Sequence, residues 1–155
     1  MLLSRNIPIG IVRLLFDSYT RQQACAVWEH HKSSYFSISN GVKQGGVISP
    51  RMFTIYIDQL LLRLKRTGIG CHIHGKYMGI LGYADDVTLL CPSIRGLNKM
   101  LSICEEFGKE YFIKFNSKKS MGIKFGEKIE ESEIAQLNNE NIKWVSSVKH
   151  RGNVI

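Results

Sequence analysis

The sequence predicts an α+β fold in which helices pack on one face of an antiparallel sheet. Three segments repeat apolar residues at helical spacing, and short runs of strand-forming residues separate them. The elements follow one another as helix, hairpin, helix, hairpin, helix and further strands, an order typical of α+β domains. With 155 residues, 44% of them hydrophobic, the chain can bury a sizeable core and corresponds to one domain or to part of a larger one.

The first helix and the first hairpin are predicted near the N-terminus. Pro8 suits the first turn of a helix, and apolar residues follow it at helical spacing, so the helix is expected over 8–21. Residues 24–28 and 35–39 are rich in strand formers, and a polar stretch joins them. They predict two strands connected by a turn around 30–33.

The second helix has the clearest pattern. Residues 40–50 form a Gly-rich loop that ends in a good helix start, with Ser49 as the N-cap and Pro50 in the first turn. The helix is predicted over 50–66, and basic residues crowd its last turn, where the helix dipole favours them. Its apolar stripe consists of Phe53, Ile57, Leu60, Leu61 and Leu64.

A second hairpin and a third helix follow. The run YMGILGYADDVTLLC has short apolar strands on either side of Asp85 and Asp86, which are therefore expected at or beside the hairpin tip. Ser93 is expected to cap the next helix. The apolar side of that helix would carry Leu97, Met100, Leu101, Cys104, Phe107, Gly108 and Tyr111. Further strands are predicted at 112–116, 120–126 and near 148–155.

The composition narrows the function classes. A net charge of +8 suits a polyanionic partner such as nucleic acid, although a soluble basic protein without such a partner has the same balance. The apolar runs are shorter than the roughly 18 residues of a membrane span, and the N-terminus lacks the features of a signal peptide. We therefore expect no membrane partner. Four widely spaced cysteines indicate an intracellular, reduced chain, in the nucleus or the cytoplasm.

The CHIH sequence at 71–74 raises the question of a zinc site. Alternation along a strand would place Cys71 on one face and both histidines on the other. A complete set of four ligands is not evident, so zinc is not expected.

The adjacent Asp85 and Asp86 are the first candidates for chemistry. Two neighbouring carboxylates repel each other, and a cation beside them removes that cost. Carboxylates suit Mg²⁺, which takes one or two of them together with waters and substrate phosphates. A pair of such ions stabilises the attacking and leaving oxygens in phosphoryl transfer. A solvated Asp-Asp turn is the alternative.

Further motifs accompany the YADD sequence of residues 83–86. GVKQGGVISP precedes it and contains Gln44 and Gly45, and FIKFNSKKS follows it with an N-x-x-K-S element that begins at Asn116. In this order, and over nearly the whole chain, the motifs resemble the reverse transcriptase domain of non-LTR (LINE-like) retrotransposons and, more distantly, group II intron proteins.

The resemblance implies a partial polymerase palm. The complete enzyme would be an RNA-directed DNA polymerase that uses two Mg²⁺ ions, an RNA template, a DNA primer and deoxynucleotide triphosphates. Asp85 and Asp86 would be catalytic and would bind the metal, with Asp85 as the main ligand, and Lys119 would protonate the leaving pyrophosphate. Contacts to nucleotide or template are implied for Gln44, Gly45, Tyr83 and Ala84. For the Gly-rich loop, the alternative is an ordinary loop before a helix. For Tyr83 it is a tyrosine with only a structural place in its strand, and for Lys119 it is a solvated lysine.

The resemblance covers the late fingers and palm, over 1–155. The family's third catalytic aspartate comes from an earlier strand, and nothing before residue 24 fits it, because Asp17 lies inside the first predicted helix. We expect the upstream catalytic strand and the thumb to be absent, and the chain alone to bind metal weakly and to polymerise poorly or not at all. VKHRGNVI resembles a primer-grip strand, with Arg151 where a leucine is expected. The alternative function is a non-catalytic remnant of a retrotransposon that binds nucleic acid.

Overall fold

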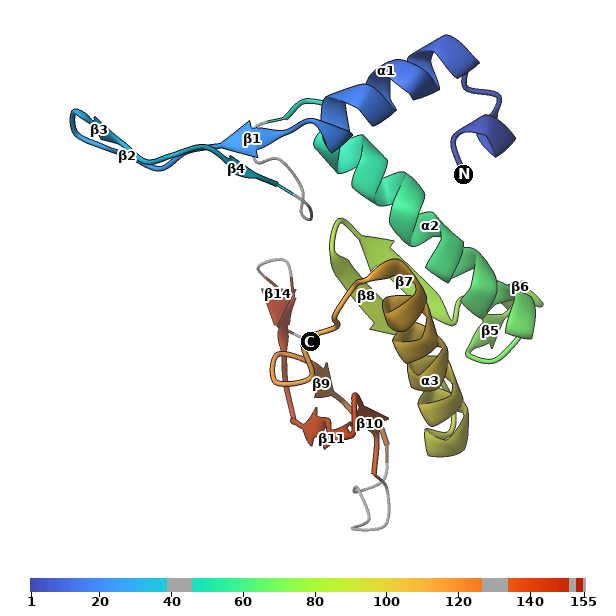
Figure 1. Cartoon of the computed structure of the whole chain (residues 1–155). Helices are drawn as coiled ribbons and strands as arrows, with labels where there is room; N and C mark the ends of the chain where they lie inside the picture. Colours follow the sequence, from blue (N-terminus) through green and yellow to red (C-terminus); the bar gives the residue numbers. More distant parts are fainter. Residues whose placement is uncertain (39–45, 127–133, 151–152, 155) are drawn as a thin grey trace. The chain divides into compact units, whose positions relative to one another are not determined.

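Figure 1 shows the computed structural model, which describes residues 1–38, 46–126, 134–150 and 153–154. The chain divides into two compact units, Met1–Tyr56 and Ile57–Ile155. The first unit contains the 3₁₀ helix η1 (Leu3–Arg5), helix α1 (Ile9–Thr20) and strands β1 (Gln23–Ala24), β2 (Val27–Trp28), β3 (His31–Lys32) and β4 (Phe36–Ser37). Helix α2 (Ser49–Thr67) begins in the first unit and ends in the second.

The second unit is built around one hairpin and one long helix. The hairpin consists of β7 (Ile80–Tyr83) and β8 (Asp86–Leu89), and α3 (Ile94–Tyr111) follows it. The remaining strands are β5 (His72–Ile73), β6 (Lys76–Tyr77), β9 (Met121–Gly122), β10 (Gln136–Leu137), β11 (Glu140–Asn141), β12 (Lys143–Trp144), β13 (Lys149–His150) and β14 (Asn153–Val154).

The predicted α+β class is confirmed. The first two predicted helices form within one residue of their expected bounds, and the third begins directly after its predicted cap, Ser93. The strands that the structure describes form seven separate pairs rather than one sheet, and the β9–β12 pair is parallel. Most of these strands are two residues long. Such short strands offer few backbone groups for a further neighbour.

Several predicted strand regions differ from the structure, and of residues 120–126 only Met121 and Gly122 form a strand. The first hairpin turns at Glu29 and His30, and Glu29 has a φ of 52°, so His31 lies in β3 rather than in the turn. Residues 113–116 form no strand, because Phe112 takes a left-handed conformation that ends α3 and Asn116 begins a tight turn. Near the C-terminus, β13 and β14 pair with each other, and Arg151 lies outside the described residues.

The core of the second unit lies between the helices and one face of the β7–β8 hairpin. Five buried residues form its centre: Leu60, Leu64, Met100, Cys104 and Phe107. Ile80 and Leu89, which pair across the hairpin, pack against them. The predicted apolar faces of the second and third helices are therefore confirmed. Burial raises the pKa of the Cys104 thiol to about 12, with a smaller contribution from Glu105.

A second buried cluster and an ion pair complete this unit. Leu101 packs with Ala135, Leu137 and Ile142, so α3 holds the segment around β10 as well. The Arg63 guanidinium donates to both carboxylate oxygens of Glu110, at 2.6 and 2.9 Å, and joins α2 to α3. Ser93 caps α3 as predicted, since its Oγ accepts from the Gly96 amide at 3.2 Å. The start of α3 is thus fixed directly after the hairpin.

Candidate functional site

The YADD sequence forms the tip of the β7–β8 hairpin. Four residue pairs align the strands, and the last of them joins Tyr83 to Asp86. Ala84 and Asp85 make the two-residue turn between the strands. The predicted hairpin with the aspartates at its tip is therefore confirmed, with Asp85 in the turn and Asp86 at the start of β8.

The core side of the hairpin fixes the position of this tip. Side chains alternate along a strand, so Gly82 faces the same way as Ile80, toward the core. A Cβ on Gly82 would lie 3.0 Å from Leu61 Cδ1, which shows how closely α2 approaches the strand. Glycine inside a strand is a known signal of such close approach. The sequence analysis did not single out Gly82, although this signal was available.

The opposite side of the hairpin is open. Leu81 and Tyr83 are 50% and 54% exposed. Asp86 lies opposite Tyr83 in the ladder, so both side chains belong to this face. Asp85 and Asp86 are both exposed. The tip therefore presents an aromatic ring and two carboxylates to solvent from a support that is anchored on its other side.

The turn itself holds an unfavourable backbone conformation. Ala84 has a φ of 51°. A side chain in the left-handed region costs roughly 1–2 kcal/mol, and glycine is the usual residue at such a turn position. Strained backbone is concentrated at functional sites, where the surrounding structure holds it in place. Ala84 thus keeps a side chain in a conformation that usually requires glycine.

Lys119 lies in a separate turn of the second unit. The Lys119 amide donates to Asn116 Oδ1 at 3.2 Å, and Ser120 Oγ donates to the Asn116 carbonyl at 2.9 Å. Asn116 and Ser120 therefore build the turn, and the Lys119 side chain is exposed. Within the described ranges, no hydrogen bond or ion pair joins Lys119 to either aspartate. This gives the asparagine and serine of the motif a structural role that the sequence analysis did not assign.

The other predicted contacts lie outside the described residues. Gln44 and Gly45 belong to the segment 39–45. Directly after it, the Ser49 amide donates to the Gly46 carbonyl, and Ser49 is buried with its hydroxyl 3.3 Å from that of Tyr19. The start of α2 is thereby held within the first unit.

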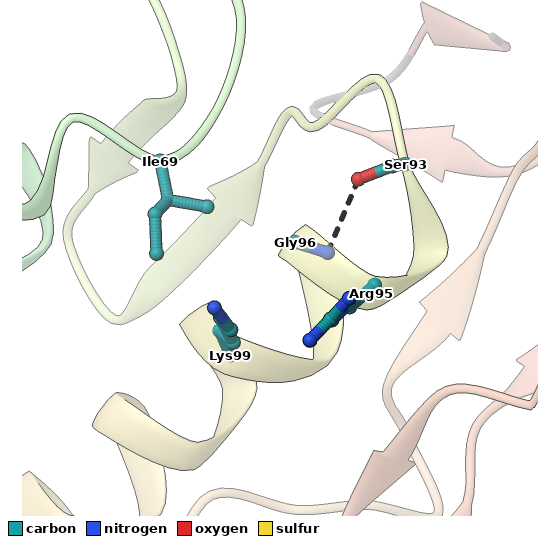
Figure 2. A pocket seen from close by; sticks show the side chains of 5 residues that line it. All are labelled: Ile69, Ser93, Arg95, Gly96 and Lys99. Carbon is teal, nitrogen blue, oxygen red and sulfur yellow. Dashed lines mark hydrogen bonds between the residues drawn. The ribbon is translucent and has the colours of Figure 1, made fainter.

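Figure 2 shows a hollow that is not part of this site. Ile69, Ser93, Arg95, Gly96 and Lys99 line it, at the beginning of α3. It follows the base of the hairpin, beyond Leu89, whereas the aspartates lie at the opposite end of β8. The candidate site is therefore the hairpin tip.

The metal-binding capacity of the tip follows from its donors. Asp85 and Asp86 supply carboxylate oxygens, which suit Mg²⁺ and other hard cations. Over the described part of the chain, no group of three or more His, Cys, Asp or Glu residues could hold a metal ion.

No described helix is long and apolar enough to cross a membrane.

The chain matches one protein family over most of its length. Residues 5–148 match the family model described as reverse transcriptase (RNA-dependent DNA polymerase). The chain belongs to this reverse transcriptase family. The family acts on nucleic-acid templates with nucleotide substrates and generally uses divalent metal ions. The hairpin tip thus carries carboxylates of the kind that such ions require.

Similar curated proteins are Pol polyproteins of R2 retrotransposable elements. The retrovirus-related Pol polyprotein from the type-1 element R2 of Popillia japonica is 37% identical over 87 residues, which are 56% of this chain and 12% of the relative. The Pol polyprotein from the type-2 element R2DM of Drosophila melanogaster is 29% identical over 119 residues, which are 76% of this chain and 11% of the relative. The Pol polyprotein from the type-1 element R2 of Nasonia vitripennis is 27% identical over 101 residues, which are 65% of this chain and 10% of the relative. The chain thus spans about a tenth of these relatives, and no solved structure matches it significantly.

Proposed function

We propose that this chain is the late fingers and palm of an RNA-directed DNA polymerase of a non-LTR retrotransposon. The complete protein would extend a DNA primer along an RNA template. The observation that carries the proposal is the strained, exposed YADD turn on an anchored hairpin, in a chain that belongs to the reverse transcriptase family. The family match also supports this function over that of a non-catalytic remnant.

In this proposal the two aspartates hold Mg²⁺. The ions, when bound, would stabilise the attacking 3′ oxygen and the leaving phosphate oxygens. Asp85, in the turn, is the main ligand, and Asp86, at the start of β8, is the flanking carboxylate. Because the hairpin is anchored, both carboxylates would stay in place while negative charge develops on the reacting oxygens. The site would therefore need little reorganisation during the reaction.

The neighbouring residues have positioning roles in the proposal. Tyr83 offers an exposed ring on the face of Asp86, where the primer end or the nucleotide would contact it. Ala84, next to Tyr83 in the chain, contacts the nucleotide or the template as well. Gln44 and Gly45 contact the nucleotide or the template, and Lys119 donates a proton to the leaving pyrophosphate. The turn built by Asn116 supports this role, because it leaves the ammonium group accessible.

The metal site is tested directly with Mn²⁺, a paramagnetic substitute for Mg²⁺. We expect Mn²⁺ to broaden the amide resonances of residues 83–87 in the 155-residue chain before others. Asp85→Asn should weaken this binding by at least about tenfold, because it removes one charged ligand. Asp17→Asn is the matched control, since Asp17 is exposed and bound to Arg21 instead. Equal broadening in all three proteins would contradict the assignment.

Primer extension on a poly(rA) template with an oligo(dT) primer tests the activity. The residues that the structure describes bring only two carboxylates together at the tip, so we expect little or no extension by the chain alone. Extension that Asp85→Asn abolishes would support the polymerase function and overturn the expectation of inactivity. Extension that persists in Asp85→Asn would contradict the catalytic assignment.

A further inference from the structure

The hollow at the beginning of α3 contains two basic side chains that the proposed polymerase site does not use. Ile69, in the segment after α2, lies across the hollow from Arg95 and Lys99 of α3 (Figure 2). The volume of about 290 Å³ is at the lower limit of the pockets that enclose a small-molecule ligand. Arg95 and Lys99 are both exposed. The hollow is therefore open and suits one charged group that projects from a larger molecule.

Contacts within the second unit hold the wall opposite α3 in place. The Tyr77 hydroxyl donates to the Ile69 carbonyl at 3.0 Å, and the Ile69 side chain packs against the buried core. The Cys71 amide donates to the Leu90 carbonyl at 2.9 Å, which joins this segment to the end of the hairpin. The hollow is thus already formed in the protein without a ligand.

The two basic residues lie where the electrostatics of α3 itself are unfavourable to them. Arg95 and Lys99 are four residues apart on one helix face, where like charges repel. Arg95 also lies in the first turn, where the helix dipole disfavours a cation and no acidic residue is present. Within the described residues, neither side chain forms an ion pair or a hydrogen bond. An anion in the hollow would remove both costs.

The chain around the hollow has the same sign of charge. Residues 59–84 contain four Lys or Arg residues and no Asp or Glu, and residues 87–104 contain only Arg95 and Lys99. Three of the first four are exposed: Lys65, Arg66 and Lys76. Nucleic acid carries one negative charge on each nucleotide, so it can contact several of these side chains at once.

We propose that this hollow binds a phosphate group of a nucleic-acid backbone between Arg95 and Lys99. The Gly96 amide already donates to Ser93 Oγ, so the two side chains, rather than the helix end, hold the phosphate. Such a contact adds affinity without selecting a sequence, because the phosphate is the same for every base. The inference rests on the proposed function only in that nucleic acid is the partner, and it requires neither metal nor catalysis.

Binding of a fluorescein-labelled RNA of about 20 nucleotides tests this site. Fluorescence anisotropy is measured on the 155-residue chain in EDTA, over a series of salt concentrations. We expect Arg95→Gln and Lys99→Gln each to lower the affinity about five- to eightfold at about 0.1 M salt. Each should also reduce the slope of log affinity against log salt by about 0.7–0.9, the effect of one lost phosphate contact. Arg95→Lys should lose less than Arg95→Gln, because the charge remains.

A matched control separates this contact from the overall charge of the protein. Lys109→Gln removes one charge from an exposed position near the other end of α3 and should leave the affinity nearly unchanged. Equal losses in Arg95→Gln, Lys99→Gln and Lys109→Gln would overturn the inference, as would no RNA binding by the unmodified chain. Thermal unfolding checks the fold, and lower stability in both hollow variants would show a structural role instead.

Two further measurements define the ligand and separate the hollow from the catalytic tip. Binding of inorganic phosphate or of dTTP that Arg95→Gln abolishes, with RNA affinity unchanged, would assign the hollow to a free phosphate compound and overturn the backbone assignment. Asp85→Asn should bind RNA as tightly as the unmodified chain. The inference can therefore fail while the polymerase assignment stands, and the reverse.

Discussion

At the residue scale, several positions are set by close backbone approach rather than by side-chain chemistry. Gly82 admits α2 beside the hairpin, and Gly108 admits the chain that turns back after α3. A Cβ on Gly108 would lie 2.5 Å from the Ile113 carbonyl oxygen, and the Ile113 amide donates to the Gly108 carbonyl at 2.9 Å. The Ala84 turn is the opposite case, in which a side chain is kept despite its backbone cost.

The helical glycines Gly108 and Gly10 should therefore respond oppositely to alanine. Gly108→Ala should destabilise the protein by about 1–3 kcal/mol, because backbone atoms must move to admit the methyl group. Gly10→Ala, with nothing within 4 Å of the new Cβ, should stabilise α1 by up to about 1 kcal/mol. Thermal unfolding followed by circular dichroism measures both. A stabilising Gly108→Ala would refute the close approach.

At the scale of elements, α2 and α3 are joined by apolar packing and by one charged contact. Arg63 lies 5.5 Å above the Phe107 ring and 5.4 Å above the Tyr111 ring, which stack on each other at 4.4 Å. Its two hydrogen bonds to Glu110 raise the pKa of Arg63 and lower that of Glu110. Because both side chains are partly exposed, solvent screens this pair and its contribution is modest.

The contribution of Glu110 to the free energy of unfolding should depend on pH. Its pKa is lowered in the folded state, chiefly by the hydrogen bonds from Arg63, so its stabilisation is complete above the usual value of 4.5. It is lost as the pH falls through the lower folded-state value. The urea midpoints of the unmodified protein and Glu110→Gln should therefore differ at pH 7, and the difference should shrink as the pH is lowered below 4.5. Glu106→Gln, an exposed change on the same helix, is the control for the removal of a carboxylate from α3.

At the scale of the whole molecule, the two units differ in how much they bury. Among the described residues of the first unit, only Ser49 is buried, and no residue of α1 is. The second unit contains both buried clusters, with Leu60, Leu64, Met100 and Phe107 fully enclosed. Burial of apolar surface supplies most of the stability of a fold.

Hydrogen exchange should reveal this difference. Amides of α3 should exchange slowly and those of α1 much faster, because local opening costs little where few apolar contacts are lost. Exchange measured by mass spectrometry on the 155-residue chain checks it. Equal protection of α1 and α3 without ligand would contradict the burial difference.

Local patterns are enough to predict the three helices, the YADD hairpin and the cap at Ser93, because each depends on spacing and turn chemistry within a few residues. They also place Asp85 and Asp86 at the tip. Which face of the hairpin is open follows only from the packed fold, since it depends on where Leu61 and the α2–α3 core lie. The packed fold likewise decided that Arg63 binds Glu110 and that the strands form separate pairs. These features arise from contacts between residues far apart in the chain, which no local pattern encodes.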